Sequence, residues 1–223
     1  MKKLIIFGNT IMAKIAWFYF GRDSGREIVG FTVDAEYNDK GEFCGLSVFD
    51  FETLEKTHPP SEYDLFIAIG PSKMNAVREM KFLEAKSKGY GLASYISPHA
   101  ICDSPVGENC FVGDRAVINP FARIGNNNYL YEAIVVSNNS IIGNHCYLSP
   151  NAYVGTFCQV EDNSIIGAGA ILKTSVNVAY KTLIGAAAYI SKNTEAHGVY
   201  GQKSTALLGC ISDKIDISLG FGG

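Results

Sequence analysis

Several features that would assign the chain to a common protein class are missing from its sequence. Lysine and arginine total 19 against 22 aspartates and glutamates, which gives a formal net charge of −3. A protein with this balance lacks the basic face that nucleic-acid binding requires. No run of about 18 apolar residues is present, and the N-terminal apolar stretch is too short for a signal peptide. We therefore expect a cytoplasmic protein that binds no nucleic acid and does not insert into a membrane.

The cysteines and glycines also lack the spacing of cofactor motifs. The six cysteines include no Cys-x-x-Cys pair and no metal-ligand spacing, so we expect no metal. No Gly-x-Gly-x-x-Gly motif occurs, which argues against a dinucleotide cofactor. Three of the cysteines fall in the small-residue column of the repeat described next, and we expect them to be buried, reduced fillers: Cys110, Cys146 and Cys158.

Residues 106–195 repeat every six residues without a break. Fifteen aliphatic residues stand six apart from Val106 to Ile190, and four places after each comes a second, mostly small residue. Glycine directly follows the aliphatic residue in seven of these hexads. A period of six matches neither the helical repeat of about 3.6 nor the alternation of a simple strand. It is typical of the hexapeptide β-helix, in which each hexad forms one short strand and a turn.

The repeat predicts a three-sided prism. The aliphatic residue points inward, the small residue fills the space beside it, and the glycine lets the backbone turn the corner. Three hexads make one coil, so residues 18 apart should stack, and the fifteen hexads give five coils. With strands about 4.8 Å apart, the prism is about 24 Å tall.

The preceding residues predict a small α/β domain. Apolar runs suggest strands at residues 2–8, 27–33, 63–70 and 91–96, with helices at 11–20, 51–56 and 72–88. Thr10 and Ser72 are expected to cap the first and last of these helices. Strands that alternate with helices predict a parallel, Rossmann-like sheet. We therefore expect an α/β domain at 1–96, a β-helix at 97–203 and a C-terminal tail at 204–223.

Ligands of such sheets bind beyond the carboxyl ends of the strands. The residues at these ends either form a ligand site or serve only as turn and cap residues. They are Gly8, Asn9, Thr10, Asp34, Gly70 and Lys73.

The whole arrangement resembles a known family. An α/β domain, Ser97-Pro98, unbroken hexads and a last coil of the form Ile-Gly-Ala-x-Ala-x-Ile-x-Lys resemble sugar O- and N-acyltransferases of the sialic acid O-acetyltransferase and bacillosamine N-acetyltransferase type. The resemblance covers about residues 2–208. It implies a left-handed β-helix, a homotrimer with active sites between adjacent prisms, acetyl-CoA or another short acyl-CoA as co-substrate, and a nucleotide-linked sugar as acceptor.

The resemblance also implies site residues by position. The sugar nucleotide would contact the six strand-end residues given above, and the pantetheine would pass the turns at Gly167–Ala168 and Gly185–Ala186. Backbone amides at such turns are donors that are fixed in place. Tyr147 stands where the family has a further histidine contact. Two lysines near the last coil, Lys192 and Lys203, could meet the CoA phosphates.

The catalytic hexad departs from the family pattern. Where the family has a catalytic histidine, this chain has Asn138, followed by Asn139, and the nearest imidazole is His145, expected in an exposed turn. An amide cannot accept a proton. A sugar hydroxyl needs a general base, whereas a sugar amine is already nucleophilic near pH 7 and mainly needs positioning.

Three functions follow from this departure. The one that we favour is an N-acetyltransferase of a nucleotide-linked amino sugar, in which Asn138 orients the substrate and no protein base takes part. The alternatives are an O-acetyltransferase that uses His145 or a water as base, and an inactive nucleotide-sugar-binding trimer. A trimer is also suggested by four tyrosines that we expect on the flat outer faces: Tyr129, Tyr131, Tyr147 and Tyr153.

Overall fold

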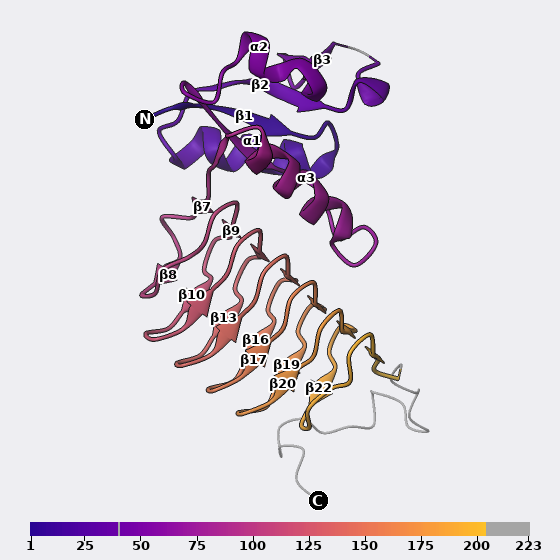
Figure 1. Cartoon of the computed structure of the whole chain (residues 1–223). Coiled ribbons are helices and arrows are strands. Elements are labelled where there is room, and N and C mark those ends of the chain that lie inside the picture. Colours follow the sequence, from indigo (N-terminus) through magenta and orange to yellow (C-terminus); the bar gives the residue numbers. More distant parts are fainter. Residues whose placement is uncertain (40, 204–223) are drawn as a thin grey trace, which may run out of the picture.

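The computed structural model describes residues 1–39 and 41–203, and the predicted tail at 204–223 lies outside these residues. The chain forms an α/β domain at one end of a three-sided, parallel β-helix (Figure 1). No helix within the described ranges is long and apolar enough to span a bilayer.

The α/β domain is built on one six-stranded sheet. Its central strand β1 has Leu4, Ile5 and Ile6 fully buried, because helices and loops cover both faces. All neighbours in the sheet are parallel except the β3–β4 hairpin, as the alternation of strands and helices predicts. The strand order is β3 (Glu42–Phe43), β4 (Leu46–Asp50), β2 (Ile28–Val33), β1 (Lys3–Phe7), β5 (Tyr63–Ile67) and β6 (Gly91–Leu92).

The helices of this domain begin differently from the sequence prediction. Thr10 occupies the N-cap position of α1, but its side chain makes no capping hydrogen bond. The last helix starts at Ala76 with Asn75 at the N-cap, so the predicted start at Ser72 is wrong. The cause is a left-handed backbone at residues 73–75, which a right-handed helix cannot include. The helical elements are α1 (Ile11–Asp23), η1 (Ala35–Tyr37), η2 (Phe51–Thr53), α2 (Leu54–Thr57) and α3 (Ala76–Ser87).

The β-helix has three flat faces of stacked two-residue strands. Residues 18 apart pair in register, for example Val117 with Val135, as the hexad count predicts. The first face contains β8 (Ile101–Cys102), β10 (Val117–Ile118), β13 (Val135–Val136), β16 (Tyr153–Val154), β19 (Ile171–Leu172) and β22 (Tyr189–Ile190). The second contains β11 (Arg123–Ile124), β14 (Ile141–Ile142), β17 (Gln159–Val160) and β20 (Asn177–Val178). The third contains β7 (Tyr95–Ile96), β9 (Phe111–Val112), β12 (Tyr129–Leu130), β15 (Tyr147–Leu148), β18 (Ile165–Ile166), β21 (Leu183–Ile184) and β23 (Val199–Tyr200).

The interior of the prism confirms the two predicted columns. Every aliphatic residue of the series after Val106 is buried, and Val106 itself packs against the same core. Cys110, Cys146 and Cys158 are free thiols among them. Burial raises the pKa of both Cys110 and Cys146 to about 12, which keeps these thiols protonated and inert.

Both ends of the prism differ from the prediction. The run at 91–96 is not one strand, because β6 joins the α/β sheet while β7 pairs with β9 of the β-helix. After the last hexad, strand β23 continues the third face and pairs with β21. Its register joins Ile184 to Tyr200, a spacing of 16 residues (200 minus 184) instead of 18, so a strict hexad count misses it.

Three of the four tyrosines predicted to lie exposed on the flat outer faces are covered, so that prediction is wrong for them. Tyr129 and Tyr131 are only 1% and 8% exposed, because the α/β domain packs on the third face, with β5 and α3 against Tyr129 and α1 against Tyr131. The Tyr131 hydroxyl contacts Met12 Sδ at 3.3 Å, and Tyr147 is half-buried in the same cluster. Of the four, only Tyr153 is exposed, and it lies on the first face. Sequence periodicity shows which side chains point outward, but not which of them the other domain covers.

Candidate functional site

A cavity of about 520 Å³ opens at the carboxyl ends of β1, β2 and β5, and we call it the carboxyl-end pocket. The strand ends meet here because parallel strands finish at the same edge of a sheet. The structure therefore brings together all six residues predicted to bind the sugar nucleotide. They are Gly8, Asn9, Thr10, Asp34, Gly70 and Lys73.

The turn after β1 needs glycine for its approach to β5. Gly8 has a φ of +125°, and a Cβ atom there would lie 2.9 Å from the carbonyl oxygen of Ala68. Asn9 Nδ2 donates to the Tyr37 carbonyl at 2.9 Å, which joins this turn to the segment after β2. Helix α1 begins at Ile11, directly after these residues. The pocket therefore lies beside a helix start, where backbone N–H groups are free and the dipole favours an anion.

Lys81 is a pocket residue that the sequence did not suggest. Its Nζ atom lies 2.6 Å from Asp34 Oδ1 and 2.8 Å from Glu84 Oε2. Burial opposes the charge on Lys81, but the hydrogen bonds to these two carboxylates raise its pKa overall. Asp34 is thereby held at the pocket wall. A lysine on the buried face of a helix is the sequence signal that could have identified Lys81.

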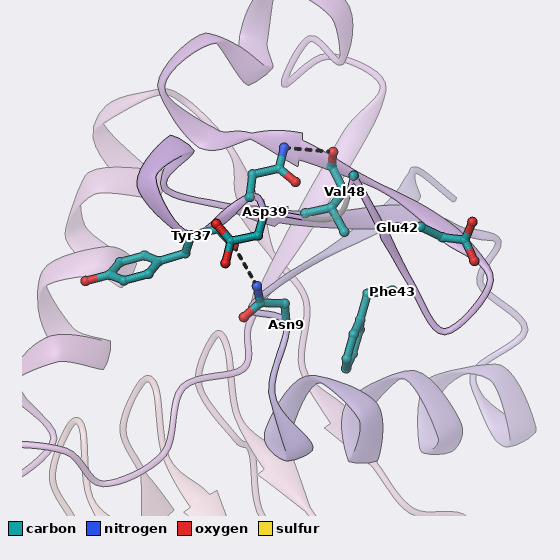
Figure 2. Close-up of a pocket in the computed structure, with 8 residues that line it drawn as sticks. Asn9, Tyr37, Asp39, Glu42, Phe43 and Val48 are labelled. Atoms are coloured by element: carbon teal, nitrogen blue, oxygen red, sulfur yellow. Dashed lines mark hydrogen bonds between the residues drawn. The ribbon is translucent and has the colours of Figure 1, made fainter.

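A smaller cavity of about 160 Å³ adjoins this pocket on the side of the edge strand β3, and we call it the edge pocket. Asn9 and Tyr37 line both cavities. Figure 2 shows Asn9 bonded to the Tyr37 carbonyl at this junction, with Phe43 on the wall near α1 and Asp39 above Asn9. Together the two cavities extend from the end of β1 past β2.

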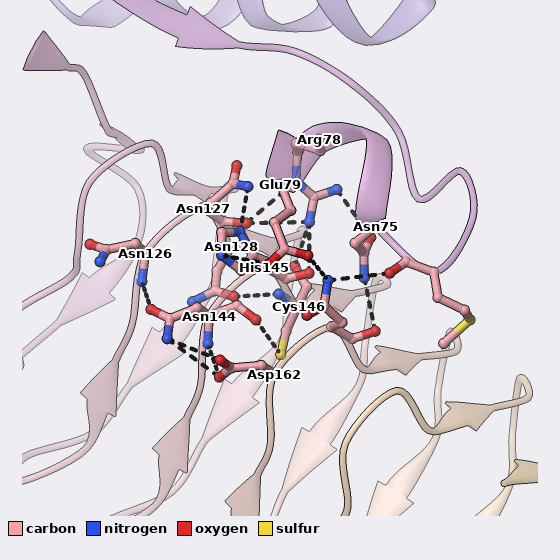
Figure 3. Close-up of polar contacts among 12 residues, drawn as sticks. Asn75, Arg78, Glu79, Asn126, Asn127, Asn128, Asn144, His145, Cys146 and Asp162 are labelled. Carbon is pink, nitrogen blue, oxygen red and sulfur yellow. Dashed lines mark hydrogen bonds and ion pairs between the residues drawn. The ribbon is translucent and has the colours of Figure 1, made fainter. Parts of the chain in front are cut away.

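His145 is buried, in contrast to the exposed turn that we predicted. It does occupy a turn, with a φ of +59°, but it is only 8% exposed because α3 packs on this corner of the prism. The Phe82 ring stands edge-on to the imidazole at 5.5 Å, and Glu79 Oε1 lies 3.8 Å from Nε2. His145 therefore faces the other domain and not an open cleft (Figure 3).

A one-way chain of hydrogen bonds fixes the proton on His145. The Ile67 N–H donates to Asn109 Oδ1 at 2.7 Å, Asn109 Nδ2 donates to Asn127 Oδ1 at 2.8 Å, and Asn127 Nδ2 lies 2.7 Å from His145 Nδ1. A backbone N–H can only donate, so it orients each amide in turn. His145 Nδ1 then accepts, and the neutral ring carries its proton on Nε2, toward Glu79. No nitrogen lone pair remains to take a proton from a substrate.

This burial predicts how stability depends on pH. Burial lowers the pKa of His145 below its ordinary value of 6.5, although Glu79 acts in the opposite direction. The unfolded chain therefore binds the proton first, and the folded state loses stability as the pH falls below about 6.5. We expect His145→Asn to lose less stability than wild type between pH 7 and pH 5, measured by denaturant midpoints. The control is His197→Asn, because His197 has the same left-handed backbone but is exposed. Parallel curves of stability against pH for wild type and both variants would contradict the prediction.

Asn138 and Asn139 lie on a different corner of the prism, between the first and second faces. Asn138 is half-buried, and its Nδ2 donates to the Pro120 carbonyl of the preceding coil at 3.4 Å. Asn139 is exposed in a left-handed turn, with a φ of +59°. Helix α3 packs instead on the corner between the second and third faces. Within the described part of the chain, Asn138 and the carboxyl-end pocket therefore do not share a cavity.

The two predicted CoA turns stack on the corner between the third and first faces. A Cβ atom on Gly167 would lie 2.5 Å from the Ala186 nitrogen, so glycine is needed for this stacking. Ala168 and Ala186 are exposed. Within the described residues, their backbone N–H groups donate to no protein acceptor. Gly185 is the first residue of the second turn. Together the two turns present unpaired backbone N–H donors along an open edge of the prism.

Equivalent N–H groups on the corner under α3 are satisfied by side chains. Asn126 Oδ1 accepts from the Glu108 N–H at 2.9 Å, and Asn144 Oδ1 accepts from the Asn126 N–H at 2.9 Å. Asp162 Oδ1 accepts from the Asn144 N–H at 2.7 Å (Figure 3). Alanine has no oxygen that could do this. Free donors such as those at Ala168 and Ala186 are therefore not a feature of every turn in the solenoid, because side chains satisfy the equivalent N–H groups under α3.

The other predicted contacts lie apart from these turns. Tyr147 stacks on Tyr129 with ring centroids 5.9 Å apart, in the aromatic cluster below α1. Lys192 and Lys203 are exposed at the C-terminal end of the prism. Within residues 1–39 and 41–203, no group of three or more histidine, cysteine or acidic side chains could hold a metal ion.

Comparison with known proteins identifies the fold. Residues 139–174 match the family model of the bacterial transferase hexapeptide (six repeats). No curated protein matches. Among solved structures, the acetyltransferase domain of PglB from Neisseria gonorrhoeae has a TM-score of 0.81 at 22% identity, covering 91% of this chain and 97% of that one. PerB from Caulobacter crescentus, solved with CoA and GDP-perosamine, has a TM-score of 0.80 at 23% identity, covering 91% and 95%.

A third solved structure agrees with these two. WeeI from Acinetobacter baumannii has a TM-score of 0.76 at 18% identity, covering 89% of this chain and 96% of that one. The chain therefore carries the bacterial transferase hexapeptide repeat and shares with these proteins the predicted fold, a Rossmann-like domain followed by a left-handed β-helix.

Proposed function

We propose that the chain is an acetyl-CoA-dependent acetyltransferase that acts on the amino group of a nucleotide-linked sugar. The observation that carries this proposal is the carboxyl-end pocket, where all six strand-end residues line one cavity large enough for a ligand. The fold supports it, because PerB was solved with CoA and GDP-perosamine and the PglB domain with acetyl coenzyme A.

The nucleotide would lie across the strand ends. Its phosphates would meet the start of α1 after Asn9 and Thr10, with Lys73 as the facing cation. Asp34 can accept two charge-assisted hydrogen bonds from a ribose or a base edge. Its ion pair with Lys81 keeps it at the wall without occupying both of its oxygens.

Acetyl-CoA would lie along the corner between the third and first faces. The free N–H groups of Ala168 and Ala186 suit the amide carbonyls of pantetheine, which are acceptors at a fixed spacing. Lys192 and Lys203 are the exposed cations at the end of this path that could meet the CoA phosphates.

The active protein would be a homotrimer. The first face has an exposed apolar stripe with one residue from each of four coils, and such a stripe on a flat face favours self-association. Because Asn138 and the carboxyl-end pocket lie on different corners, a sugar held by one protomer would reach Asn138 of its neighbour. The exposed fractions in the stripe are 58% for Ile101, 41% for Tyr153, 44% for Ile171 and 61% for Tyr189.

The proposed reaction is direct attack by the amine. The neutral nitrogen lone pair forms a bond to the thioester carbonyl carbon, the carbon–sulfur bond breaks, and the CoA thiolate leaves and takes the proton from nitrogen. Asn138 would orient the amino group or an adjacent hydroxyl. A hydroxyl nucleophile would need a base during attack. His145 does not suit that role, because its Nδ1 lone pair is engaged by Asn127.

This mechanism makes Asn138 a modest contributor. Asn138→Ala should lower kcat/KM by about tenfold, the loss expected for one hydrogen bond. The rate should rise with pH through the amine's own pKa and then level, with no second limb from an enzyme base.

His145→Asn should keep at least about a tenth of the wild-type rate. If that variant folds and binds both substrates but does not turn over, His145 is the base after all.

The function itself is tested by a mass-spectrometric screen. The chain is incubated with acetyl-CoA and a panel of nucleotide-linked amino sugars, each paired with the corresponding hydroxy sugar. We expect a gain of one acetyl group on an amino sugar and none on its hydroxy counterpart. Acetylation of the hydroxy sugars would favour the O-acetyltransferase, and binding without acetylation would favour an inactive nucleotide-sugar-binding trimer.

A further inference from the structure

Residues 70–75, which we call the pocket loop, carry a run of disfavoured backbone. Gly70 and Lys73 of this loop line the carboxyl-end pocket. Lys73, Met74 and Asn75 have φ values of +49°, +53° and +64°, three successive left-handed residues without a glycine. Residues with a side chain rarely adopt this region, and such a run persists only where the surroundings hold it.

Part of that support comes from the β-helix. Asn75 is fully buried, and its Nδ2 atom lies 3.3 Å from the Asn163 carbonyl and 3.5 Å from the Ser164 carbonyl. In return, Asn163 Nδ2 donates to the Met74 carbonyl at 3.4 Å and to Glu79 Oε2 at 2.8 Å. Two of the three left-handed residues are therefore bonded to one turn of the prism.

Arg78 joins the same two regions from inside. It is fully buried, and its Nη1 atom donates to the Ile69 carbonyl at 3.3 Å and to Asn75 Oδ1 at 3.1 Å, at the two ends of the pocket loop. Its Nη2 atom donates to the carbonyls of His145 at 3.1 Å and Cys146 at 3.0 Å (Figure 3). One guanidinium thus connects the pocket loop to the corner of the β-helix. The acceptors are backbone carbonyls and one side-chain amide. Several hydrogen bonds, and not one ion pair, therefore fix the position of the Arg78 guanidinium.

We propose that the β-helix sets the shape of the carboxyl-end pocket through these contacts. Asn163, Asn75 and Arg78 act as positioning residues that hold the left-handed pocket loop so that Lys73 faces the phosphates of the bound nucleotide. The inference rests on the proposed function, because it assigns the nucleotide to this pocket. It adds that nucleotide affinity depends on a β-helix residue that does not line the pocket.

Asn163→Gly tests this with little risk to folding. Glycine keeps the left-handed turn of residue 163 and removes only the amide that bonds Met74 and Glu79. The control is Ser175→Gly, an exposed left-handed residue of another corner. We expect calorimetry to show about tenfold weaker binding of the nucleoside diphosphate that wild type prefers, from a panel of GDP, UDP, dTDP and ADP. CoA affinity should stay within about twofold, and the control should change neither value.

Combination with Lys73→Ala separates positioning from general damage. If Asn163 acts through Lys73, the double variant should bind the nucleotide about as weakly as Lys73→Ala alone. Additive losses, or equal losses for nucleotide and CoA, would overturn the inference. So would unchanged nucleotide binding by Asn163→Gly, and that result would leave the proposed function intact. A wild-type chain that binds none of the four nucleotides would instead reject the proposed nucleotide site, and the inference with it.

Discussion

Val136→Asp is expected to destabilise the β-helix by several kcal/mol and to lower its melting temperature by about 10 °C or more. Val136 is fully buried in the aliphatic column, stacked between Ile118 and Val154 of the adjacent coils. A carboxylate there has no partner and no water, so it is either charged at high cost or protonated with a strongly raised pKa. Thermal unfolding followed by circular dichroism measures the change.

Gln159→Asp is the matched control, because residue 159 is exposed on the second face and takes the same new side chain. It should melt within about 2 °C of wild type, as most surface substitutions do. An unchanged midpoint for Val136→Asp would mean that the aliphatic column does not face a dry interior, which would reject the prism as described.

The double variant Tyr153→Asp, Ile171→Asp is expected to dissociate the proposed trimer and to lower acetyl transfer by at least about 100-fold. The two residues are neighbours in the apolar stripe of the first face. The loss should be this large because the proposed CoA turns at Ala168 and Ala186 lie on a different corner of the prism from the nucleotide pocket, so one protomer alone would not bring the thioester to the sugar amine. Nucleotide affinity should remain, since the carboxyl-end pocket belongs to a single protomer. Light scattering and an acetyl-transfer assay give the two readouts.

The control for this variant is Leu83→Asp, which adds a carboxylate at an exposed apolar position of α3, away from the first face. It should remain trimeric and active. A wild-type mass near the 24.2 kDa of one chain would rule out the trimer. A monomeric double variant with full activity would show that one protomer contains the whole site.

The parts of the molecule that follow from a repeat or from sheet geometry could be predicted from sequence. The hexads determine which residues face the core, because a period of six with three strands per coil repeats the same two inward positions, one aliphatic and one small, in every hexad. The six strand-end residues, from Gly8 to Lys73, can be predicted to line one pocket because the carboxyl ends of parallel strands meet at one edge of the sheet, however the side chains pack. Both features are independent of how the two domains pack against each other.

What could not be predicted depends on contacts between distant segments. Arg78 reaches Cys146, 68 residues away, and a hydropathy pattern does not reveal such a partner. The burial of Tyr129 and of His145 has the same origin, because the α/β domain covers the outer surface on which both lie. The late start of α3 has a different cause. Lys73 and Met74 are not residues that signal a left-handed backbone, so the sequence suggested a helix there.

The column of turns under α3 also limits how the solenoid can change in length. Helix α3 bonds to three consecutive rungs, at Asn127, His145 and Asn163, which are spaced by one full coil each. An insertion of one hexad between Asn127 and His145 would move His145 to the next corner of the prism, out of reach of Arg78. Only whole-coil insertions keep later residues on their corners, and even these would separate rungs that α3 needs side by side. The contacts of α3 therefore fix the length of the solenoid from Asn127 to Asn163, whereas they set no limit on changes beyond Asn163 in steps of 18 residues.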